Sequence, residues 1–239
     1  MIRALVTGGS GDIGGAICRA LALAGHHVIV HANGNPARAQ AVVDAIHSAG
    51  GSAEAVVFDV SDGEASRAAV ERLLETGPVQ IVVNNAGIHD DAPMAGMSER
   101  QWRRVIDVSL HGFFHVTQPL LLPMARTRWG RIITVSSVAA ILGNRGQTNY
   151  AAAKAALHGA SKSLAREMAS RGITVNVIAP GVIAGSMSES AFPAEQIKAL
   201  VPAARAGKPE EVAALAAFLS SDAAAYINGQ IIGIDGGMS

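Results

Sequence analysis

The feature that most constrains the fold is a regular alternation of short apolar runs with longer amphipathic stretches. The apolar runs are rich in valine and isoleucine. Near-continuous runs of this length are typical of strands that are buried on both faces of a parallel sheet. They predict strands within residues 2–7, 27–32, 54–59, 80–85, 131–137, 173–180 and 229–235.

The alanine-rich stretches between these runs predict crossover helices, because parallel strands need a long connection. No linker, repeat or low-complexity segment interrupts the series. The sequence therefore predicts an α/β fold, with residues 1–239 as a single doubly wound domain. The expected helices cover residues 12–24, 36–49, 63–75, 98–125, 149–170 and 209–220.

Composition and charge narrow the class of protein. Apolar residues make up 49% of the chain and charged residues 16%, which allows a sizeable core and excludes global disorder. The 19 basic and 19 acidic side chains cancel, so net charge favours no nucleic-acid partner. Cys18 is the one cysteine and is expected to be buried filler. No signal peptide or membrane-spanning run is visible, which predicts a soluble, cytoplasmic protein.

A glycine-rich loop joins the first expected strand to the first expected helix, in ALVTGGSGDIGGAI. Small residues there let the backbone approach a pyrophosphate, and the helix start supplies free N–H donors. A tight strand-to-helix turn is the alternative. In the register T-G-x-x-x-G-x-G, Thr7, Gly8 and Gly14 fit, and Asp12 stands where the middle glycine belongs. The other register, G-x-G-x-x-G, uses Gly9, Gly11 and Gly14.

The end of the second strand bears on the choice of dinucleotide. An NAD enzyme usually carries an acid there to bind the ribose hydroxyls. This strand ends VIVHANGN, and no carboxylate follows until Asp44. A ribose 2′-phosphate would not be repelled, and Asn33 and Asn35 can donate hydrogen bonds to it. The sequence favours NADP over NAD, with Arg38 as a loosely placed candidate for the phosphate.

Two further segments are expected at the carboxyl edge of the sheet, where such folds bind ligands. The motif NNAG, residues 84–87, ends the fourth strand, and its glycine permits close approach of a ligand; a plain turn is the alternative. Residues 184–208 break the alternation and are rich in Ser, Ala, Gly and Pro. They predict a mobile flap over the site, with an ordinary surface loop as the alternative.

The most informative spacing is that of Ser137, Tyr150 and Lys154. Tyrosine and lysine four residues apart on a helix share one face. A phenol with a pKa near 10 exchanges protons poorly at neutral pH, and a nearby ammonium lowers that pKa. The serine can hydrogen-bond the same substrate oxygen. Alone, the Tyr/Lys pair would be an ordinary surface contact; beside the other motifs it predicts a catalytic group.

The segment HGFFH places His111 and His115 at a spacing that metal ligands use. It lacks the acidic residue of a zinc-protease helix, and no third ligand is evident. No metal site is expected.

Together, TGGSGDIG, NNAG, the serine before YAAAK, and APG strongly resemble the short-chain dehydrogenase/reductase family. The resemblance covers essentially the whole chain and selects the register T-G-x-x-x-G-x-G. Within that family the phrases GRIITVSSV, YAAAKAAL and FLSSDAAAYINGQ are most similar to the 3-oxoacyl-[acyl-carrier-protein] reductases. It implies a Rossmann-type domain with a seven-stranded parallel sheet, helices on both faces, and usually a homotetramer.

The resemblance also implies roles for individual residues. Tyr150 is expected to protonate a carbonyl oxygen as hydride arrives from the nicotinamide. Lys154 is expected to hold the nicotinamide ribose and depress the tyrosine pKa, while Ser137 polarises the carbonyl. Besides Tyr150 and Lys154, the residues expected to bind NADPH are Thr7, Gly8, Gly9, Ser10, Asp12, Ile13, Gly14, Asn33, Asp59, Val60, Asn85, Ala86, Gly87, Pro180, Gly181 and Ile183.

The carrier-protein reductases use arginines beside the active-site entrance to dock an acyl carrier protein. Their matches here are Arg128 and Arg171, with Arg131 nearby, and such cations suit an acidic carrier helix. The resemblance therefore implies an acyl carrier protein with a thioester-bound 3-oxoacyl chain as partner.

Three residues depart from the family pattern. Ser109 stands where the family usually has an asparagine that anchors a proton-relay water, so a rearranged or slower relay is expected. Gly185 replaces the usual threonine after the sixth strand, which removes a hydroxyl contact to the cofactor. Asp12 can cap the helix start, but its charge faces a phosphate site unless it turns away. All three predict tuning of the activity rather than its loss.

The leading hypothesis is NADPH-dependent reduction of a carrier-bound 3-oxoacyl thioester, for fatty acids or for a dedicated polyketide-like or polyene pathway. A second hypothesis keeps the chemistry but takes a free sugar, steroid or small alcohol as substrate. A third is a nucleotide-sensing module without catalysis, against which the complete set of Ser137, Tyr150 and Lys154 speaks.

Overall fold

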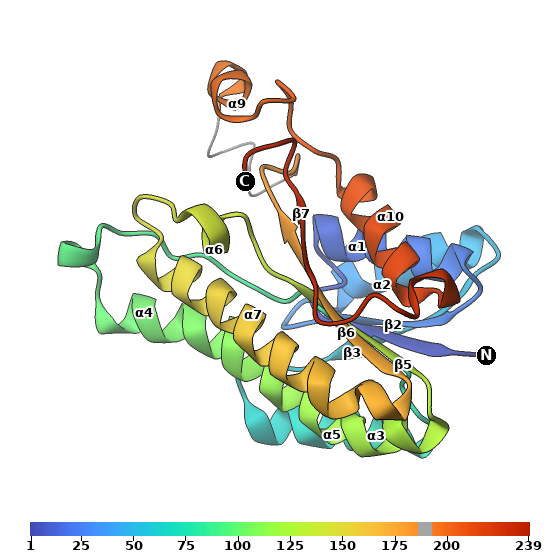
Figure 1. The fold of residues 1–239 in the computed structure, drawn as a ribbon. Helices are drawn as coiled ribbons and strands as arrows, with labels where there is room; N and C mark the ends of the chain where they lie inside the picture. Colours follow the sequence, from blue (N-terminus) through green and yellow to red (C-terminus); the bar gives the residue numbers. More distant parts are fainter. Residues whose placement is uncertain (186–192) are drawn as a thin grey trace.

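The seven apolar runs form one seven-stranded sheet in which every neighbouring pair of strands is parallel (Figure 1). The order across the sheet is β3-β2-β1-β4-β5-β6-β7, which confirms the expected fold class. The structure is a computed structural model and describes residues 1–185 and 193–239. The strands are β1 (Arg3–Val6), β2 (His27–Ala32), β3 (Ser52–Val57), β4 (Ile81–Asn84), β5 (Gly130–Val135), β6 (Ile173–Pro180) and β7 (Ile231–Ile234).

Helices cover both faces of the sheet (Figure 1). α1 packs closely on α10 and touches α2 on one face, while α3 packs on α5, and α7 on β6, on the other. The longer helices are α1 (Asp12–Leu23), α2 (Pro36–Ser48), α3 (Gly63–Glu75), α4 (Glu99–Ile106), α5 (Gly112–Thr127), α7 (Thr148–Met168) and α10 (Pro209–Ser220). The short ones are η1 (Met94–Gly96), η2 (Asp107–His111), α6 (Ala139–Leu142), η3 (Ala169–Arg171), α9 (Ala194–Leu200) and η4 (Asp222–Ala224).

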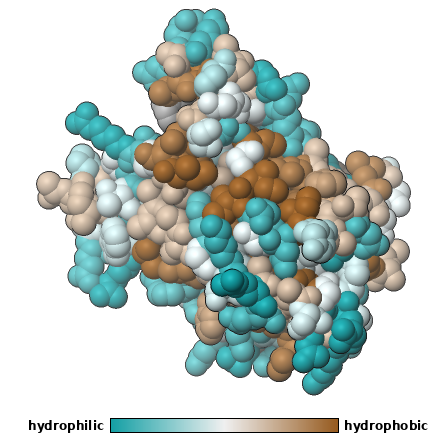
Figure 2. Space-filling view, viewed as in Figure 1, coloured by the Kyte–Doolittle hydropathy of each residue, from teal (hydrophilic) through white to brown (hydrophobic). Residues whose placement is uncertain are grey.

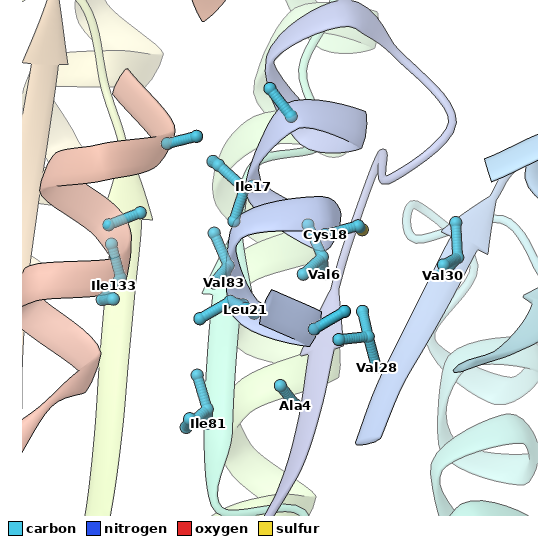
Figure 3. Close-up of a cluster of buried hydrophobic side chains, with 14 of the residues drawn as sticks. Ala4, Val6, Ile17, Cys18, Leu21, Val28, Val30, Ile81, Val83 and Ile133 are labelled. Carbon is cyan, nitrogen blue, oxygen red and sulfur yellow. The ribbon is translucent and has the colours of Figure 1, made fainter. Parts of the chain in front are cut away.

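Each face of the sheet carries its own apolar core. Figure 3 shows the core beneath α1, where Ile17, Cys18 and Leu21 point toward side chains of β1, β2, β4 and β5. Ile17 and Leu21 are fully buried, and burial of a side chain of this size stabilises a fold by about 1.5–3 kcal/mol. Because both faces are covered in this way, the central strands need valine and isoleucine at nearly every position.

The order of the strands reverses direction between β1 and β4. On one side of this point the chain proceeds outward through β2 and β3, and on the other through β5, β6 and β7. In open α/β sheets the crevice at the carboxyl ends of the strands beside such a reversal is where ligands bind. The loops after β1 and β4, which contain the glycine-rich motif and NNAG, meet at this place.

The helix expected over residues 98–125 is interrupted. α4 and α5 are separated by η2, one turn of π-helix that contains Ser109. Residues 107–111 contain no glycine or proline to mark a break, so the sequence did not predict the interruption. Single π-turns inside helices are frequent at functional sites. The short helix α6 was also not expected.

The segment expected as a flap is described only in part, because residues 186–192 lie outside the described residues. Its two ends are joined beside the sheet, where Ile183 and Gly207 form an isolated parallel bridge. The amide of Ala184 donates to Gly207 O at 2.8 Å, and the amide of Gly207 donates to Val182 O at 2.9 Å. This bridge holds the root of the segment; its mobility stays a prediction.

Apolar side chains gather on one face of the molecule, over β7 and toward α10 (Figure 2). β7 is the edge strand of the sheet, and Ile231, Ile232 and Ile234 are only partly buried. Phe218 of α10 and Tyr226 are exposed. No helix in the described part of the chain is long and apolar enough to cross a bilayer.

Candidate active site

The three residues of the expected catalytic group lie together between β5 and the first turns of α7. Ser137 follows the end of β5, and Tyr150 and Lys154 lie one turn apart near the start of α7. Tyr150 is hydrogen-bonded to Ser137. The Lys154 amine lies 5.7 Å from the centre of the Tyr150 ring and donates a 2.9 Å hydrogen bond to the carbonyl oxygen of Val135.

The start of α7 is held in place from the opposite side of the site. The side-chain amide of Asn149 donates to Asp90 O at 3.0 Å and to Gln101 O at 3.1 Å, and its oxygen accepts from the amide of Tyr150. Gln147 donates to the Asp91 carboxylate at 2.8 Å. These bonds tie Tyr150 to the segment after β4 and to α4, so the phenol is fixed by three elements.

The pKa shifts in this group differ from the sequence-based expectation. Burial raises the pKa of Tyr150; the hydrogen bond with Ser137 lowers it in part, and the charge of Asp91 raises it further. Burial also lowers the pKa of Lys154 to about 8. The net pKa of Tyr150 is therefore raised rather than lowered, and the lowering effect expected of Lys154 stays a prediction. Lys154 is 3% exposed, and its amine is turned to the Val135 carbonyl.

The glycine loop is joined to NNAG by a compact set of hydrogen bonds. Thr7 Oγ1 accepts from the amides of Asn85 and Ala86, both at 3.0 Å, and the Asn85 side chain donates to Thr7 O and Gly8 O. A Cβ on Gly14 would collide with Gly8 O and with the Asn85 amide. Gly8 has a φ of +63°. These requirements match the register T-G-x-x-x-G-x-G.

A cavity of about 940 Å³ lies at the reversal point of the sheet, which is a size that small-molecule sites commonly have. Of the residues expected to bind the cofactor, most line it: Gly8, Ser10, Asp12, Ile13, Gly14, Asn33, Asp59, Val60, Asn85, Ala86, Gly87 and Ile183. Thr7 and Gly9 lie behind the loop instead, where Thr7 bonds NNAG and Gly9 packs on Cys18. Pro180 ends β6, and Gly181 packs against Asp235.

Gly87 connects the cavity to the catalytic group. It lines the cavity, and a Cβ placed on it would stand 3.0 Å from the Lys154 amine and 3.8 Å from Ser109 Oγ. Any larger residue would therefore press on the lysine. Ser109, in the π-turn, is 4% exposed, and its hydroxyl has no hydrogen-bond partner among the described residues. A buried hydroxyl without a partner is costly, so this position suits a bound water or substrate group.

The two departures Asp12 and Gly185 lie against each other. A Cβ on Gly185 would stand 2.5 Å from Asp12 Oδ2, and Gly185 has a φ of +151°. The Asp12 carboxylate is thus directed at the segment after β6. The expectation that Asp12 caps the helix is not met in this form, since the N-cap of α1 is Gly11 and no side chain caps it. Uncapped amides at a helix start fit a phosphate.

Two residues of the cavity wall were not firmly predicted from the sequence: His31 was not expected there, and Arg38 was a candidate without a defined position. His31 is buried on β2 and lines the cavity, and the available signal was a polar residue inside the apolar run VIVHA. Arg38 lines the same cavity as Asn33, and its contact with the ribose 2′-phosphate stays a prediction. Asn35 instead caps α2 through the amide of Arg38.

The arginines expected beside the active-site entrance lie at the other edge of the sheet. Arg128 ends α5 just before β5, and Arg171 lies in η3 just before β6. Tyr150 is at the opposite end of α7, and at about 1.5 Å per residue the helix separates it from Arg171 by about 30 Å. Arg131 is buried and paired with Asp222 at 3.1 Å, so it is no docking residue.

The remaining candidates have ordinary structural partners. His111 bonds Asp107 at 2.8 Å, and His115 bonds Val60 O at 2.9 Å, which holds the segment after β3 against α5. Within residues 1–185 and 193–239, no three His, Cys, Asp or Glu side chains gather as a metal site would require. Burial raises the pKa of the Cys18 thiol to about 12, as expected of a cysteine that only fills space.

A doubly wound sheet, a glycine loop at the start of α1, and a Ser-Tyr-Lys group beside it define an oxidoreductase of the short-chain dehydrogenase/reductase class. The family described as "Enoyl-(Acyl carrier protein) reductase" matches residues 9–239. The chain belongs to this family of short-chain dehydrogenases/reductases.

Individual relatives cover nearly the whole chain. The 3-oxoacyl-[acyl-carrier-protein] reductase FabG of Escherichia coli (strain K12) is 44% identical, with 98% of this chain and 96% of that protein covered. That of Aggregatibacter actinomycetemcomitans is 41% identical, with 98% of each chain covered. A crystal structure of a putative gluconate dehydrogenase from Agrobacterium tumefaciens superimposes with a TM-score of 0.96 at 36% identity, covering 99% of this chain and 95% of that one.

Proposed function

We propose that the protein reduces the ketone of a 3-oxoacyl thioester, carried on an acyl carrier protein, to the 3-hydroxyacyl thioester with NADPH. The observation that carries the proposal is the joining of the Ser137, Tyr150 and Lys154 group to the dinucleotide-sized cavity through Gly87. The relatives that match 41–44% of their residues over almost the full length are named for this reaction.

The side chains divide the work on the substrate ketone. NADPH, when bound, supplies the hydride that adds to the carbonyl carbon. The raised pKa of Tyr150 keeps its hydroxyl protonated at neutral pH, so it can give a proton to the carbonyl oxygen. Ser137 donates a second hydrogen bond to the same oxygen and stabilises its developing negative charge.

Lys154 and Ser109 would restore the proton that Tyr150 gives up. The Lys154 amine, with its pKa lowered to about 8, exchanges protons readily near neutral pH. Ser109 lies near it, across Gly87, with a buried and unpartnered hydroxyl. A water held at this hydroxyl would pass a proton from bulk solvent to the amine, which is the rearranged relay expected from the sequence.

NADPH is proposed over NADH because of the side chains around the expected ribose position. Asn33 and Arg38 line the cavity together, and both are exposed to it. Asp59, at the end of β3, has its carboxylate engaged by the amide and hydroxyl of Ser61 at 2.8 and 2.7 Å. A cation and an amide would therefore be available to hold the 2′-phosphate, while the Asp59 carboxylate is engaged by Ser61.

Carrier docking and assembly remain part of the proposal. Arg128 and Arg171 are exposed cations, but Arg171 lies about 30 Å along α7 from the Tyr150 of its own chain. Arg128 lies beside it, because its guanidinium donates to Ser170 O at 3.3 Å. A carrier bound to them would have to serve the site of a neighbouring protomer. The apolar face over β7 in Figure 2 is a surface that the proposed homotetramer would cover. We propose the cytoplasm as the location.

A free polyol or sugar acid is the second candidate substrate, favoured by the 36% identity to a putative gluconate dehydrogenase. The deciding assay follows the absorbance of NADPH with 3-oxoacyl, enoyl and sugar substrates in parallel. Rapid oxidation of NADPH with the carrier-bound 3-oxoacyl chain supports the proposal. Turnover of an enoyl thioester or of gluconate with NADP⁺, without turnover of the ketone, would contradict it.

A further inference from the structure

His31 occupies an unusual position in the wall of the cavity. It lies on β2 and is 1% exposed, and its ring makes one hydrogen bond to each of two neighbouring loops. Its Nδ1 atom is 3.0 Å from the amide nitrogen of Gly8 in the glycine loop. Its Nε2 atom is 2.9 Å from the carbonyl oxygen of Phe58 at the end of β3.

These two contacts select a single state of the ring. The Gly8 amide can only donate, so Nδ1 must be unprotonated; the Phe58 carbonyl can only accept, so Nε2 must carry the hydrogen. The ring is therefore neutral. Burial lowers the pKa of His31 against the opposing effects of the Phe58 hydrogen bond and the Asp59 charge, which agrees with a neutral ring at pH 7.

The Gly8 amide has little freedom to find another hydrogen-bond acceptor. Gly8 has a φ of +63°, and its backbone stands against Asn85 and Ala86 on the other side, where a Cβ would be only 3.0–3.1 Å from their atoms. The loop is thus held between NNAG and His31. Without an acceptor at Nδ1 the amide would be left unpaired or would turn toward the cavity, and the loop would lose the conformation seen here.

We propose that His31 is a positioning residue for the cofactor: its neutral ring accepts from the Gly8 amide and fixes the glycine loop in the shape that receives the pyrophosphate. The inference rests on the proposed NADPH site. His31 touches no reacting atom, so its effect falls on cofactor affinity and leaves the chemical step intact. The alternative is a core histidine that merely packs on Phe58, whose ring centre is 4.3 Å away.

Two substitutions separate the two ring nitrogens. In His31→Asn the amide oxygen stands near the Nδ1 position and can still accept from Gly8. In His31→Gln the longer side chain can reach Phe58 O in place of Nε2, but it leaves Gly8 without its acceptor. His47→Asn is the matched control, because that histidine also bonds a backbone carbonyl, Ala53 O at 3.0 Å, but does not line the cavity.

The experiment measures the dissociation constant of NADPH by fluorescence, and the KM for NADPH and kcat with a saturating 3-oxoacyl thioester. His31→Gln is expected to weaken NADPH binding and raise KM about tenfold with kcat nearly unchanged, while His31→Asn and His47→Asn stay within about threefold of the wild type. Equal losses in the Asn and Gln variants at position 31, or no loss in either, would overturn the inference.

A second measurement needs no cofactor, so it separates this inference from the proposed function. The hydrogen-exchange rate of the Gly8 amide reports its hydrogen bond directly. It is expected to be slow in the wild type and in His31→Asn, and at least about tenfold faster in His31→Gln. An unchanged rate in His31→Gln would overturn the inference even if the wild-type protein binds NADPH; a wild type that binds no NADPH contradicts the proposed function alone.

Discussion

The burial of the Lys154 amine is expected to lower the free energy of unfolding of the protein. The folded protein lowers its pKa from the ordinary 10.5 to about 8, because the amine is buried with one carbonyl as its hydrogen-bond partner. At pH 7 the folded state must therefore hold an ammonium in a site that disfavours charge. We therefore expect Lys154 to contribute through its proposed catalytic role rather than through the free energy of folding.

Replacement of Lys154 by methionine is expected to abolish turnover and to stabilise the fold at pH 7 by up to about 3 kcal/mol, since one pKa unit corresponds to about 1.4 kcal/mol. Between pH 8 and 10.5 the unfolded chain keeps a proton that the folded wild type has released, so wild-type stability rises with pH. Urea denaturation of both proteins at pH 7 and pH 10 measures this. If the difference in the free energy of unfolding between the two proteins is as large at pH 10 as at pH 7, the buried ammonium is not its cause.

We expect the choice of cofactor to depend on Arg38, in the first turn of α2. Arg38→Glu is expected to raise the KM for NADPH at least about tenfold and to leave the KM for NADH within about twofold, because only NADPH carries the 2′-phosphate. Arg100→Glu, another arginine of the cavity wall, on α4, is the control. Equal effects on both cofactors would place the 2′-phosphate elsewhere.

Two of the residues that depart from the family pattern, Asp12 and Gly185, lie outside the middles of helices and strands. The start of α1 and the segment after β6 interlock through Asp12 and Gly185, where a Cβ would stand 2.5 Å from the carboxylate. Gly185→Thr alone is therefore expected to displace one of the two segments.

The interlock predicts a coupling between the two positions. Gly185→Thr should weaken NADPH binding about tenfold or more, and the double variant Asp12→Gly/Gly185→Thr should recover part of that loss. The carboxylate that meets the threonine is gone in the double variant, whereas the backbone strain of a threonine at a φ of +151° remains. Asp12→Gly alone serves as the reference. Strictly additive effects in fluorescence titrations would show that the two residues act independently.

The sequence predicted the elements well wherever packing alone determines them. α3 and α10 begin and end at the expected residues, and every strand overlaps its expected run. The signal is strongest for the central strands β4, β5 and β6, which are buried throughout and are therefore rich in valine and isoleucine. The π-turn at Ser109 was not predicted, since residues 107–111 contain no glycine or proline to mark a break in the helix. Distances in space, such as the contact of Asp12 with Gly185, have no signal in one sequence.

At the scale of the whole molecule, the Ser-Tyr-Lys group and the two proposed docking arginines lie at opposite ends of the strands, although the resemblance placed them together. The proposed catalytic residues and the cavity lie at the carboxyl ends of the strands, while Arg128 and Arg171 precede β5 and β6 at the amino ends. A sequence motif does not tell at which end of the sheet a residue lies, nor whether it serves its own protomer or a neighbouring one. The roles expected for Ser137, Tyr150 and Lys154 are compatible with their grouping, and the docking role requires another protomer.

The double variant Arg128→Glu/Arg171→Glu is expected to lower kcat/KM for a carrier-bound 3-oxoacyl chain about tenfold or more, because the acidic carrier would then meet like charges. Turnover of acetoacetyl-N-acetylcysteamine, a short free thioester, should stay within about twofold. Arg166→Glu on α7 is a control for charge alone. Equal losses with both substrates would show that the arginines act on the fold and not on the carrier.

The central claim is that the hydroxyl of Tyr150 donates the proton in the reaction. The most direct measurement is the single-turnover rate of NADPH oxidation by Tyr150→Phe, with the fold and NADPH affinity checked independently. The account predicts a rate at least about a thousandfold below that of the wild type, with NADPH binding retained. A correctly folded variant that binds NADPH and reduces the 3-oxoacyl thioester at the wild-type rate would contradict it.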